Sequence, residues 1–403
     1  MKIRLVKSEH LGDIYFVIYL FLFSMLKPIT SSSPQISTYV LFGGVVVLLF
    51  LTIVNNRVSR KMFTQWALIS VLVLGWLSFD FVVRHNSMQI EMYYNFMLYG
   101  VLPLFFLTSV RDYKVVLKAY TILSIVIGII FLVDPFMNYQ WSSSYMEFGL
   151  GFMLPAFCGA LIALFYYKKK LSIALCVIFL IEMIICGNKS VIIAAGVLLV
   201  VFYWFFNPGK RIYAYLRVML IAIAVVLVYF FRLEILDIFI GISKDLDMDS
   251  YALSTFRIML AGESSLVYNT RLSIWDDAWQ QFLNSPILGQ GFGYFESLSS
   301  SSSGYVHNIE LDILVASGLV GGIVYIFLLV KSIIKLVRCK DRDKQLLLAV
   351  LLISWFVPMQ FSLSLWKVMN FWVYWGVCYF RNPQTVAEPY EYPVDRSING
   401  RNL

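Results

Sequence analysis

Charged side chains are scarce in this chain of 403 residues. Asp, Glu, Lys and Arg make up only 14% of it, whereas a typical soluble domain has about 25%. Histidine occurs only three times, and the five cysteines include no CxxC pair. The cysteine spacing therefore indicates neither a zinc site nor a disulfide framework, and the scarcity of charge excludes an ordinary soluble globule.

Hydrophobic residues make up 60% of the chain, aromatic residues make up 17%, and the mean hydropathy is +0.77. Stretches of about twenty apolar residues follow one another, and each has the length of one bilayer crossing. Aromatic side chains are also typical of membrane interfaces. We predict an all-α, polytopic integral membrane protein with about twelve transmembrane helices, at residues 11–29, 36–54, 64–83, 91–110, 115–134, 147–167, 171–187, 190–206, 213–231, 308–330, 346–362 and 366–380.

The net charge of +8 indicates either binding to nucleic acid or an excess of Lys and Arg in cytoplasmic loops. The second interpretation is favoured, because the basic loops alternate with neutral or Ser-rich loops along the predicted spans. We therefore expect no nucleic-acid partner, and we place both termini in the cytoplasm. The basic residues on that side are Lys2, Arg4, Lys7, Arg57, Arg60, Lys61, Arg111, Lys114, Lys168–Lys170, Lys210, Arg211 and those from Lys331 to Lys344.

This alternation depends on three assignments. Residues 171–206 and 346–380 are each read as two helices, because a single span in either place would move the later basic loops to the other side. The N-terminal basic cluster and apolar run also fit a cleaved signal peptide, but removing it would invert the charge pattern, so we predict an uncleaved first helix. Residues 1–380 then form one membrane domain, and residues 381–403 form a cytoplasmic tail.

One long extracytoplasmic loop, residues 232–307, interrupts the succession of spans. Long loops in compact proteins are usually functional. Residues 289–293, with the sequence GQGFG, predict a flexible turn in this loop, and Asn269 or Thr270 is predicted to cap a helix before it. That helix is amphipathic and lies on or between the membrane spans, because apolar side chains recur at helical spacing at Leu272, Trp275, Trp279, Phe282 and Leu283.

The loop ends at His307 and Asn308, where the next hydrophobic span begins. An imidazole at a bilayer surface can take up protons or bind anions. Gly318 and Gly322 follow in the same span with GxxxG spacing, which predicts close helix packing. This junction of a titratable group and a membrane helix suggests chemistry on a lipid-linked substrate.

These residues occur in an order that resembles the O-antigen ligase and Wzy-type polymerase superfamily. The matching motifs lie within residues 269–325, the ligase-like region extends over about 190–363, and the twelve-span layout with one large late loop agrees. The resemblance implies a GT-C-like membrane glycosyltransferase. In chain order the motifs are Arg271, Trp275, Pro286-Ile287-Leu288-Gly289-Gln290-Gly291-Phe292-Gly293, His307-Asn308 and Gly318-Leu319-Val320-Gly321.

The resemblance further implies a multi-pass enzyme of the bacterial inner membrane that uses no metal and no other cofactor. A saccharide leaves an undecaprenyl diphosphate carrier at the outer face and passes to an acceptor. In a polymerase of O-antigen, capsule or exopolysaccharide the acceptor is a fresh lipid-linked repeat unit, whereas in a ligase it is lipid A-core. The expected partners are the lipid-linked donor and acceptor, membrane lipid, a chain-length regulator and a flippase.

The resemblance places two catalytic residues, Arg271 and His307, near the diphosphate. Arg271 heads the predicted amphipathic helix and would stabilise developing phosphate charge, with an ordinary arginine at lipid headgroups as the alternative. His307 either takes the proton of the acceptor hydroxyl or, when protonated, binds the diphosphate. The sequence leaves both roles open.

Four further residues are candidates for substrate binding. Lys189 stands where the family usually has arginine, and it offers a point charge in place of a planar fork. Asn308 either orients the imidazole or caps the next helix. Glu310 is three residues from His307 and on the same face, where it would tune the imidazole, bind acceptor sugar or interact with the helix dipole. Arg257 is the least specific, with a solvated surface charge as the alternative.

Two alternatives to a polymerase stay open. A ligase shares the chemistry, and the polymerase is preferred because Lys189 departs from the arginine usual in ligases. A twelve-span transporter or lipid-sugar flippase fits the number of helices, but transporters are commonly built from repeats, and this chain shows no matching halves.

Overall fold

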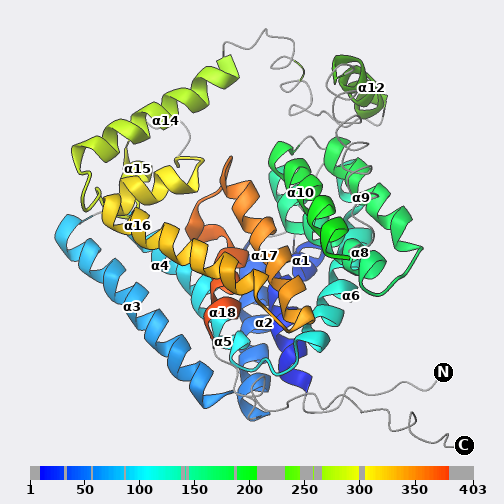
Figure 1. Ribbon diagram of the computed structural model, residues 1–403, viewed down its shortest axis with the longest axis horizontal. Helices are drawn as coiled ribbons and strands as arrows, with labels where there is room; N and C mark the ends of the chain where they lie inside the picture. The colour runs from blue at the N-terminus through cyan, green and yellow to red at the C-terminus, as the bar shows by residue number, and fades with distance from the viewer. Residues whose placement is uncertain are drawn as a thin grey trace, which may run out of the picture.

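A computed structural model of the chain is mostly helical over the residues that it describes, without a strand among them (Figure 1). These are residues 10–30, 34–55, 58–85, 88–137, 141, 145–185, 188–206, 232–245, 257, 266–298 and 305–380. Over them the predicted all-α class is confirmed. The predicted span 213–231 and the predicted tail 381–403 lie outside the described residues.

The other predicted spans all overlap helices. Within the described residues, six helical segments are long and apolar enough to cross a membrane, and three more are apolar but shorter. A polytopic membrane protein is therefore confirmed, whereas the number twelve stays a prediction. The helices are α1 (Leu11–Thr30), α2 (Pro34–Val54), α3 (Arg60–Arg84), α4 (Met88–Phe96), α5 (Leu102–Leu107), α6 (Tyr113–Phe131), α7 (Tyr145–Glu147), α8 (Leu154–Phe165), α9 (Ser172–Ile185), α10 (Lys189–Phe206), α12 (Arg232–Asp245), α14 (Leu266–Asn284), α15 (Tyr294–Ser297), α16 (Ile309–Val337), α17 (Arg342–Met359) and α18 (Met369–Tyr379).

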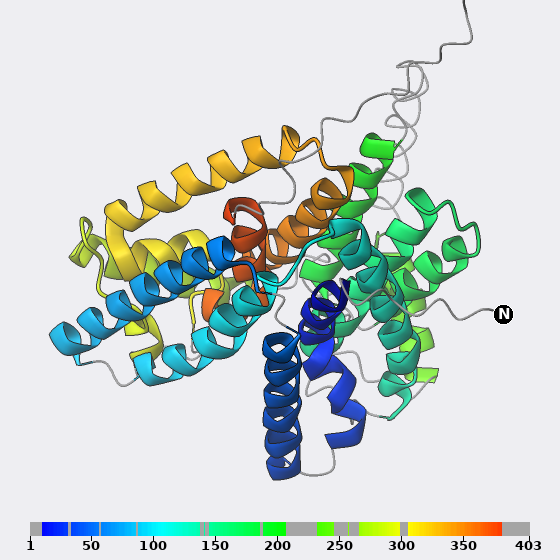
Figure 2. The ribbon, with the colours of Figure 1, turned by 90° about the horizontal axis from the view of Figure 1, so that it is seen from below.

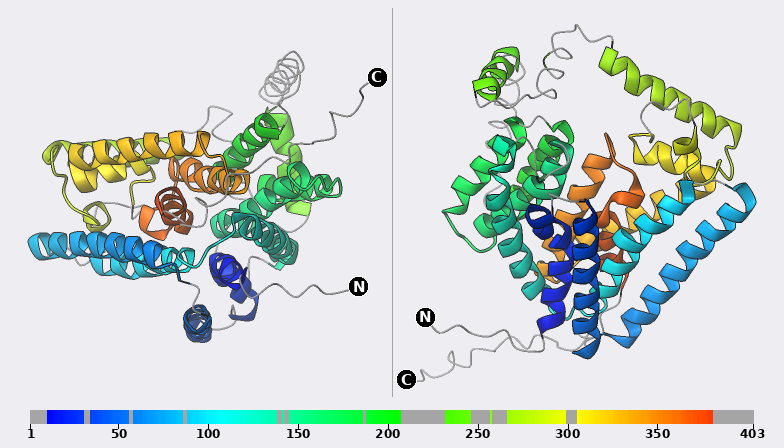
Figure 3. Two further views of the ribbon diagram at one scale, coloured as in Figure 1. Left: turned by 60° about the horizontal axis from the view of Figure 1, so that its bottom comes forward. Right: turned by 180° about the vertical axis from the view of Figure 1, so that it is seen from behind.

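Both predicted divisions of long apolar stretches are confirmed. α9 ends at Ile185 and α10 begins at Lys189, so 171–206 forms two helices. α17 ends at Met359, and a 3₁₀ turn, Leu365–Lys367, precedes α18. In Figures 2 and 3, α18 lies between α16 and the α4–α5 stretch, and it packs against both.

Contacts between helix ends agree with the predicted alternation of the spans. Ends assigned to the outer face meet one another: Lys27 Nζ lies 3.0 Å from Glu147 Oε1, and Lys367 Nζ lies 2.8 Å from Glu91 Oε1. An inner pair meets likewise, since the Tyr166 hydroxyl donates to Asp343 Oδ1 at 2.6 Å. The two sets of ends are therefore grouped as alternating spans require, while the side that faces the cytoplasm stays a prediction.

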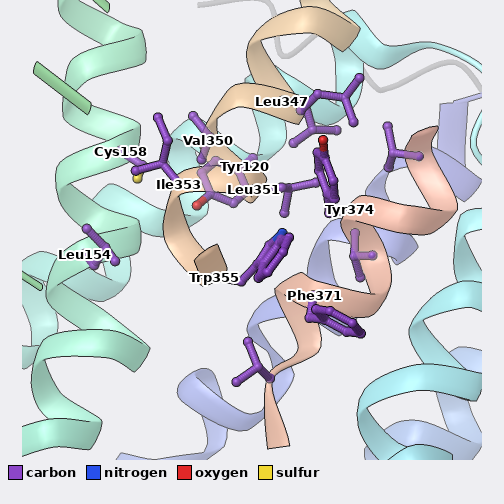
Figure 4. Close-up of a cluster of buried hydrophobic side chains, with 14 of the residues drawn as sticks. Tyr120, Leu154, Cys158, Leu347, Val350, Leu351, Ile353, Trp355, Phe371 and Tyr374 are labelled. Atoms are coloured by element: carbon purple, nitrogen blue, oxygen red, sulfur yellow. The ribbon is translucent and has the colours of Figure 1, made fainter. Parts of the chain in front are cut away.

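α17 is the central helix of the buried core (Figure 4). The ring of Trp355 is fully buried and packs edge-on against Phe371 of α18, with ring centroids 5.1 Å apart. On its other side α17 meets α8, where Ser354 Oγ lies 3.8 Å from Cys158 Sγ. Because lipid offers no hydrophobic drive between helices, close packing of this kind holds the bundle together.

Candidate active site

The predicted amphipathic helix exists as α14, but it begins five residues earlier than Arg271, at Leu266. Asn269 and Thr270 are therefore inside the helix, and the prediction that either caps its start is wrong. Arg271 lies in the second turn instead of heading the helix, so the exposed N–H groups of the first turn do not surround it. The helix ends at Asn284.

The buried face of α14 also differs from the prediction. Ile274, Ala278 and Phe282 are buried against α15 and α16 and share a cluster with Val306. Three residues predicted for the apolar face, Leu272, Trp279 and Leu283, are 42%, 44% and 49% exposed. Phe282 is buried as predicted, and the small Ala278 lets α14 approach its neighbours closely.

The glycine-rich turn after α14 is a fixed structure that completes a break in α16. Gly318 interrupts α16 with φ 63° and ψ −161°. The backbone groups freed by the break pair with the preceding segment: the N–H groups of Gln290 and Gly291 donate to the carbonyls of Val315 and Ala316 at 2.7 and 3.0 Å. The N–H of Leu319 donates back to Pro286 O at 2.8 Å. The predicted flexible turn is thus held by backbone hydrogen bonds.

Gly318 therefore has a role that the GxxxG spacing did not predict. A Cβ atom there would lie 2.4 Å from the carbonyl carbon and oxygen of Ile287. One at Gly289, which has φ 70°, would lie 2.4 Å from Ser317 N. The glycines allow the turn to dock on the broken helix, whereas the sequence spacing suggested contact between two helices.

His307 occupies a strained backbone position just before α16. Its φ of 60° is in the left-handed region, which costs a non-glycine residue of order 1–3 kcal/mol and often marks a functional site. The ring of Tyr305 lies against the imidazole with ring centroids 4.0 Å apart, and the Tyr305 hydroxyl lies 3.2 Å from Ser362 Oγ. Asn308 Oδ1 accepts from the N–H of Leu311 at 3.0 Å. Asn308 therefore caps α16, which is one of its two predicted roles.

The half-buried imidazole is held in its neutral form. Burial, followed by the positive charge of Arg271, lowers the pKa of His307 to about 4. Its Nδ1 atom is buried and lacks a hydrogen-bond partner among the described residues. A neutral imidazole has one unprotonated nitrogen that can accept a proton, and without a positive charge it is poorly suited to bind an anion.

Two of the predicted cations meet near this histidine, and a third does not. The exposed Arg271 acts electrostatically on both His307 and Lys189, which begins α10. The starts of α10 and α14 and the segment before α16, which are distant in the sequence, thus place Lys189 and His307 each within electrostatic range of Arg271, and these three residues are called the His307 group. Arg257 instead forms a two-point ion pair with Asp237 of α12. Its contact favours the surface-charge alternative over substrate binding.

Glu310 is placed with one carboxylate oxygen fixed and the other without a partner. Gln360 Nε2, after the end of α17, donates to Glu310 Oε1 at 3.0 Å. Glu310 Oε2 is buried and has no hydrogen-bond partner within the described residues, and neither has the indole N–H of Trp275 on α14. Buried polar atoms of this kind are usually satisfied by water or by a ligand.

Two cavities share a wall, and the smaller of them reaches Tyr305, whose ring lies against His307. The smaller, about 180 Å³, is lined by Tyr305, Glu91 and Glu296 among others. The larger, about 620 Å³, lies among α1, α8, α17 and α18. Leu363 and Lys367 line both cavities, so together the cavities extend from Tyr305 into the centre of the helical bundle.

The larger cavity is bordered by two π-helical turns, Met97–Val101 and Phe148–Met153. Each precedes a proline, Pro103 or Pro155, which cannot donate to the carbonyl four residues earlier. The freed carbonyl of Gly151 accepts from Ser24 Oγ of α1 at 3.4 Å, and both residues line the cavity. Turns of this type are frequent at functional sites because they leave backbone groups available.

Sequence reasoning missed three residues of the α17–α18 connection, which contact Glu310, Tyr305 and Glu91. Gln360, Ser362 and Lys367 are polar residues in an otherwise apolar stretch, and that contrast was the available signal. Among the described residues no three His, Cys, Asp or Glu side chains are grouped as metal ligands. The predicted independence from metal stays a prediction.

A family model described as O-antigen ligase matches residues 174–326, from α9 into α16. The matched segment contains Lys189, Arg271, His307 and Glu310, and it overlaps the predicted region of about 190–363. No curated protein matches the chain. The match supports the resemblance of this segment to the O-antigen ligase and polymerase superfamily, whose members are enzymes of the glycosyltransferase type, and the apolar helices are those of a membrane protein.

Proposed function

We propose that this protein is a polysaccharide repeat-unit polymerase of the bacterial inner membrane. It transfers a growing glycan from undecaprenyl diphosphate to a lipid-linked repeat unit at the outer face. The observation that carries the proposal is the grouping of two cations, Lys189 and Arg271, with an imidazole that burial and Arg271 keep neutral. The first two suit a diphosphate leaving group, and the third suits an acceptor hydroxyl.

On the donor side, Arg271 and Lys189 stabilise the charge that develops as the sugar leaves the carrier. The guanidinium can hold two phosphate oxygens at once, while the ammonium acts as a point charge. The repulsion between these cations is relieved when a diphosphate binds between them. The diphosphate of the donor thus places negative charge between the two cations.

On the acceptor side, His307 acts as the general base. The acceptor oxygen forms a bond to the anomeric carbon of the donor sugar as the bond from that carbon to the phosphate oxygen breaks. The diphosphate leaves with the bonding electron pair, and the hydroxyl proton passes to the imidazole. Glu310, oriented by Gln360, is three residues from His307 and is available to bind the acceptor sugar or the imidazolium that forms.

We place the acceptor in the two adjoining cavities. Their walls combine hydroxyls, charged groups and aromatic rings, among them Tyr99, Lys367 and Glu91. A total volume of this size suits a small oligosaccharide, since ligand pockets commonly measure 300–1,000 Å³. Lys367 stands on the wall between the cavities, where it can contact a sugar that extends from His307 toward the bundle centre.

The alternative within the same chemistry is a ligase that uses lipid A-core as the acceptor. It is supported by the description of the matching family. The polymerase is preferred because Lys189 replaces the arginine usual in ligases. A flippase and a chain-length regulator are the partners that this reaction needs for supply and for control of its product.

The proposal is tested by the polysaccharide of cells that carry single variants. His307→Ala and Arg271→Ala should each abolish long chains while the protein stays inserted in the membrane. Gln280→Ala, an exposed position on α14, is the matched control and should leave the chains unchanged. Loss of polymerase leaves a single repeat on lipid A-core, loss of ligase leaves none, and normal chain-length ladders in both active-site variants would refute the assignment.

A further inference from the structure

A third cavity lies away from the His307 group, where α3 and α4 meet the glycine-rich turn. It measures about 310 Å³, and its walls include Arg84, Gln89, Phe292, Tyr294 and Ser297. Gln290 and Phe292 of the glycine-rich turn line this cavity. The same turn is bonded to α16 through the N–H groups of Gln290 and Gly291, which donate to Val315 and Ala316. Ala316 is eight residues beyond Asn308 (316 − 308), or about 12 Å along a helix that rises 1.5 Å per residue.

The carboxylate of Asp80 fixes the polar side chains of this cavity. Arg84 Nε lies 3.1 Å from Asp80 Oδ1, and the Phe292 N–H donates to Asp80 Oδ2 at 3.0 Å. Gln89 Nε2 also donates to Asp80 Oδ2, and to the carbonyl of Phe292 at 3.2 Å. Asp80 therefore neutralises Arg84 and orients the Gln89 amide at the same time.

This arrangement leaves one donor and one acceptor unsatisfied. Because Gln89 Nε2 is directed at Asp80 and Phe292, its Oε1 must face the opposite way. Oε1 of this fully buried residue and Nη1 of Arg84 both lack hydrogen-bond partners within the part of the chain that the structure describes. A buried polar atom left unpaired costs about 1–3 kcal/mol, so Oε1 calls for a donor and Nη1 for an acceptor, and a hydroxyl group offers both.

A sugar hydroxyl is such a group, and an anion is not. A phosphate or carboxylate would accept from Arg84 but would meet the Gln89 carbonyl oxygen and the charge of Asp80. The aromatic walls, Phe292 and Tyr294, offer apolar faces to the carbon-bound hydrogens of a sugar ring. The chemistry of the cavity thus matches an uncharged, hydroxyl-bearing ring.

We infer that this cavity is a distal saccharide subsite, which binds one sugar residue of the glycan at a distance from the reacting carbon. The role of this subsite during catalysis rests on the proposed function, whereas its binding of a free oligosaccharide does not. The conformation of the glycine turn makes the site possible. Gly291 has φ 102°, and a Cβ there would lie 2.6 Å from Arg84 Nη1 and 2.9 Å from Asp80 Oδ2.

The test fills the cavity and measures binding without turnover. The probe is the lipid-free oligosaccharide released from the host's own repeat units, titrated calorimetrically into purified full-length protein in nanodiscs. Ser297 is exposed on the cavity wall, so Ser297→Trp blocks the space and Ser297→Ala leaves it open. We expect Ser297→Trp to weaken binding about tenfold or more, with Ser297→Ala within about twofold of the parent protein.

A second blocking variant guards against misfolding. His85→Trp enters from the opposite wall at an exposed position and should weaken binding as Ser297→Trp does, with an unchanged unfolding temperature. His307→Ala should bind the oligosaccharide normally although it transfers nothing. Unchanged binding in either blocking variant, or no binding by the parent protein, overturns the subsite. Binding without chain elongation would refute the proposed function and leave the subsite intact.

Discussion

The neutral state of His307 makes a prediction that depends on one neighbouring charge. Burial and then Arg271 lower the pKa of His307 to about 4. Replacing Arg271 by Gln removes the positive charge and leaves burial in place. The pKa of His307 should then rise, while staying below the ordinary value of about 6.5. Arg271→Lys keeps the charge and should leave the pKa close to that of the parent protein.

The neutral fraction of a histidine with a pKa of 4 differs most from that of an ordinary histidine, with a pKa of about 6.5, at a pH between these two values. At pH 5.5 a histidine with a pKa of 4 is about 97% neutral, whereas one with a pKa of 6.5 is about 9% neutral. If His307 is the general base, the parent enzyme should therefore retain nearly all of its kcat/KM at pH 5.5. An unperturbed histidine would lose about tenfold under the same conditions.

The titration can be observed directly because the chain has only three histidines. Imidazole ¹⁵N NMR spectra of labelled protein in nanodiscs should contain three imidazole signals, and the His307 signal is the one absent from His307→Ala. The control is Arg271→Lys, in which the His307 midpoint should match that of the parent protein. A His307 midpoint near 6.5 in the parent protein, or no rise in Arg271→Gln, would refute the reasoning.

Three further predictions concern the supports of the site. Gly318→Ala should lower the unfolding temperature and destabilise the fold by about 1–3 kcal/mol, because its Cβ would meet Ile287; Gly196→Ala, with open space around it, should not. Gln360→Leu should lower kcat about tenfold with little change in KM, because it releases Glu310; a change confined to KM would contradict this. Lys367→Met should raise the KM for the acceptor severalfold and leave donor binding unchanged, as separate titrations of the two substrates would show.

The features that the sequence predicts best are those with a strong local signal. The apolar runs predict the helices, and the loop charges predict which helix ends lie on the same face. The Lys27–Glu147 and Lys367–Glu91 ion pairs agree with this grouping, because each joins two ends assigned to the outer face. Asn308 sits at a polar-to-apolar boundary and caps α16 as one of its two predicted roles. Each of these properties depends on a few neighbouring residues and on the bilayer as solvent.

The features that the sequence does not predict depend on contacts between distant segments. The face of α14 that is buried depends on how closely α15 and α16 approach Ala278, which its own periodicity does not record. The break at Gly318 requires the turn at 286–291 to satisfy the freed backbone, so the GxxxG spacing alone suggested ordinary packing. The same applies to Gln360, which reaches Glu310 across fifty positions of the chain.

The most direct test of the central claim is reconstitution of the reaction with a defined substrate. Purified protein is incubated with an undecaprenyl-diphosphate-linked repeat unit in the presence of a chelator, and the products are separated by length. The account predicts a ladder of two and more repeats with the parent protein, and only the single repeat with His307→Ala. A parent protein that never lengthens the repeat unit, or a His307→Ala variant that produces the same ladder, would contradict it.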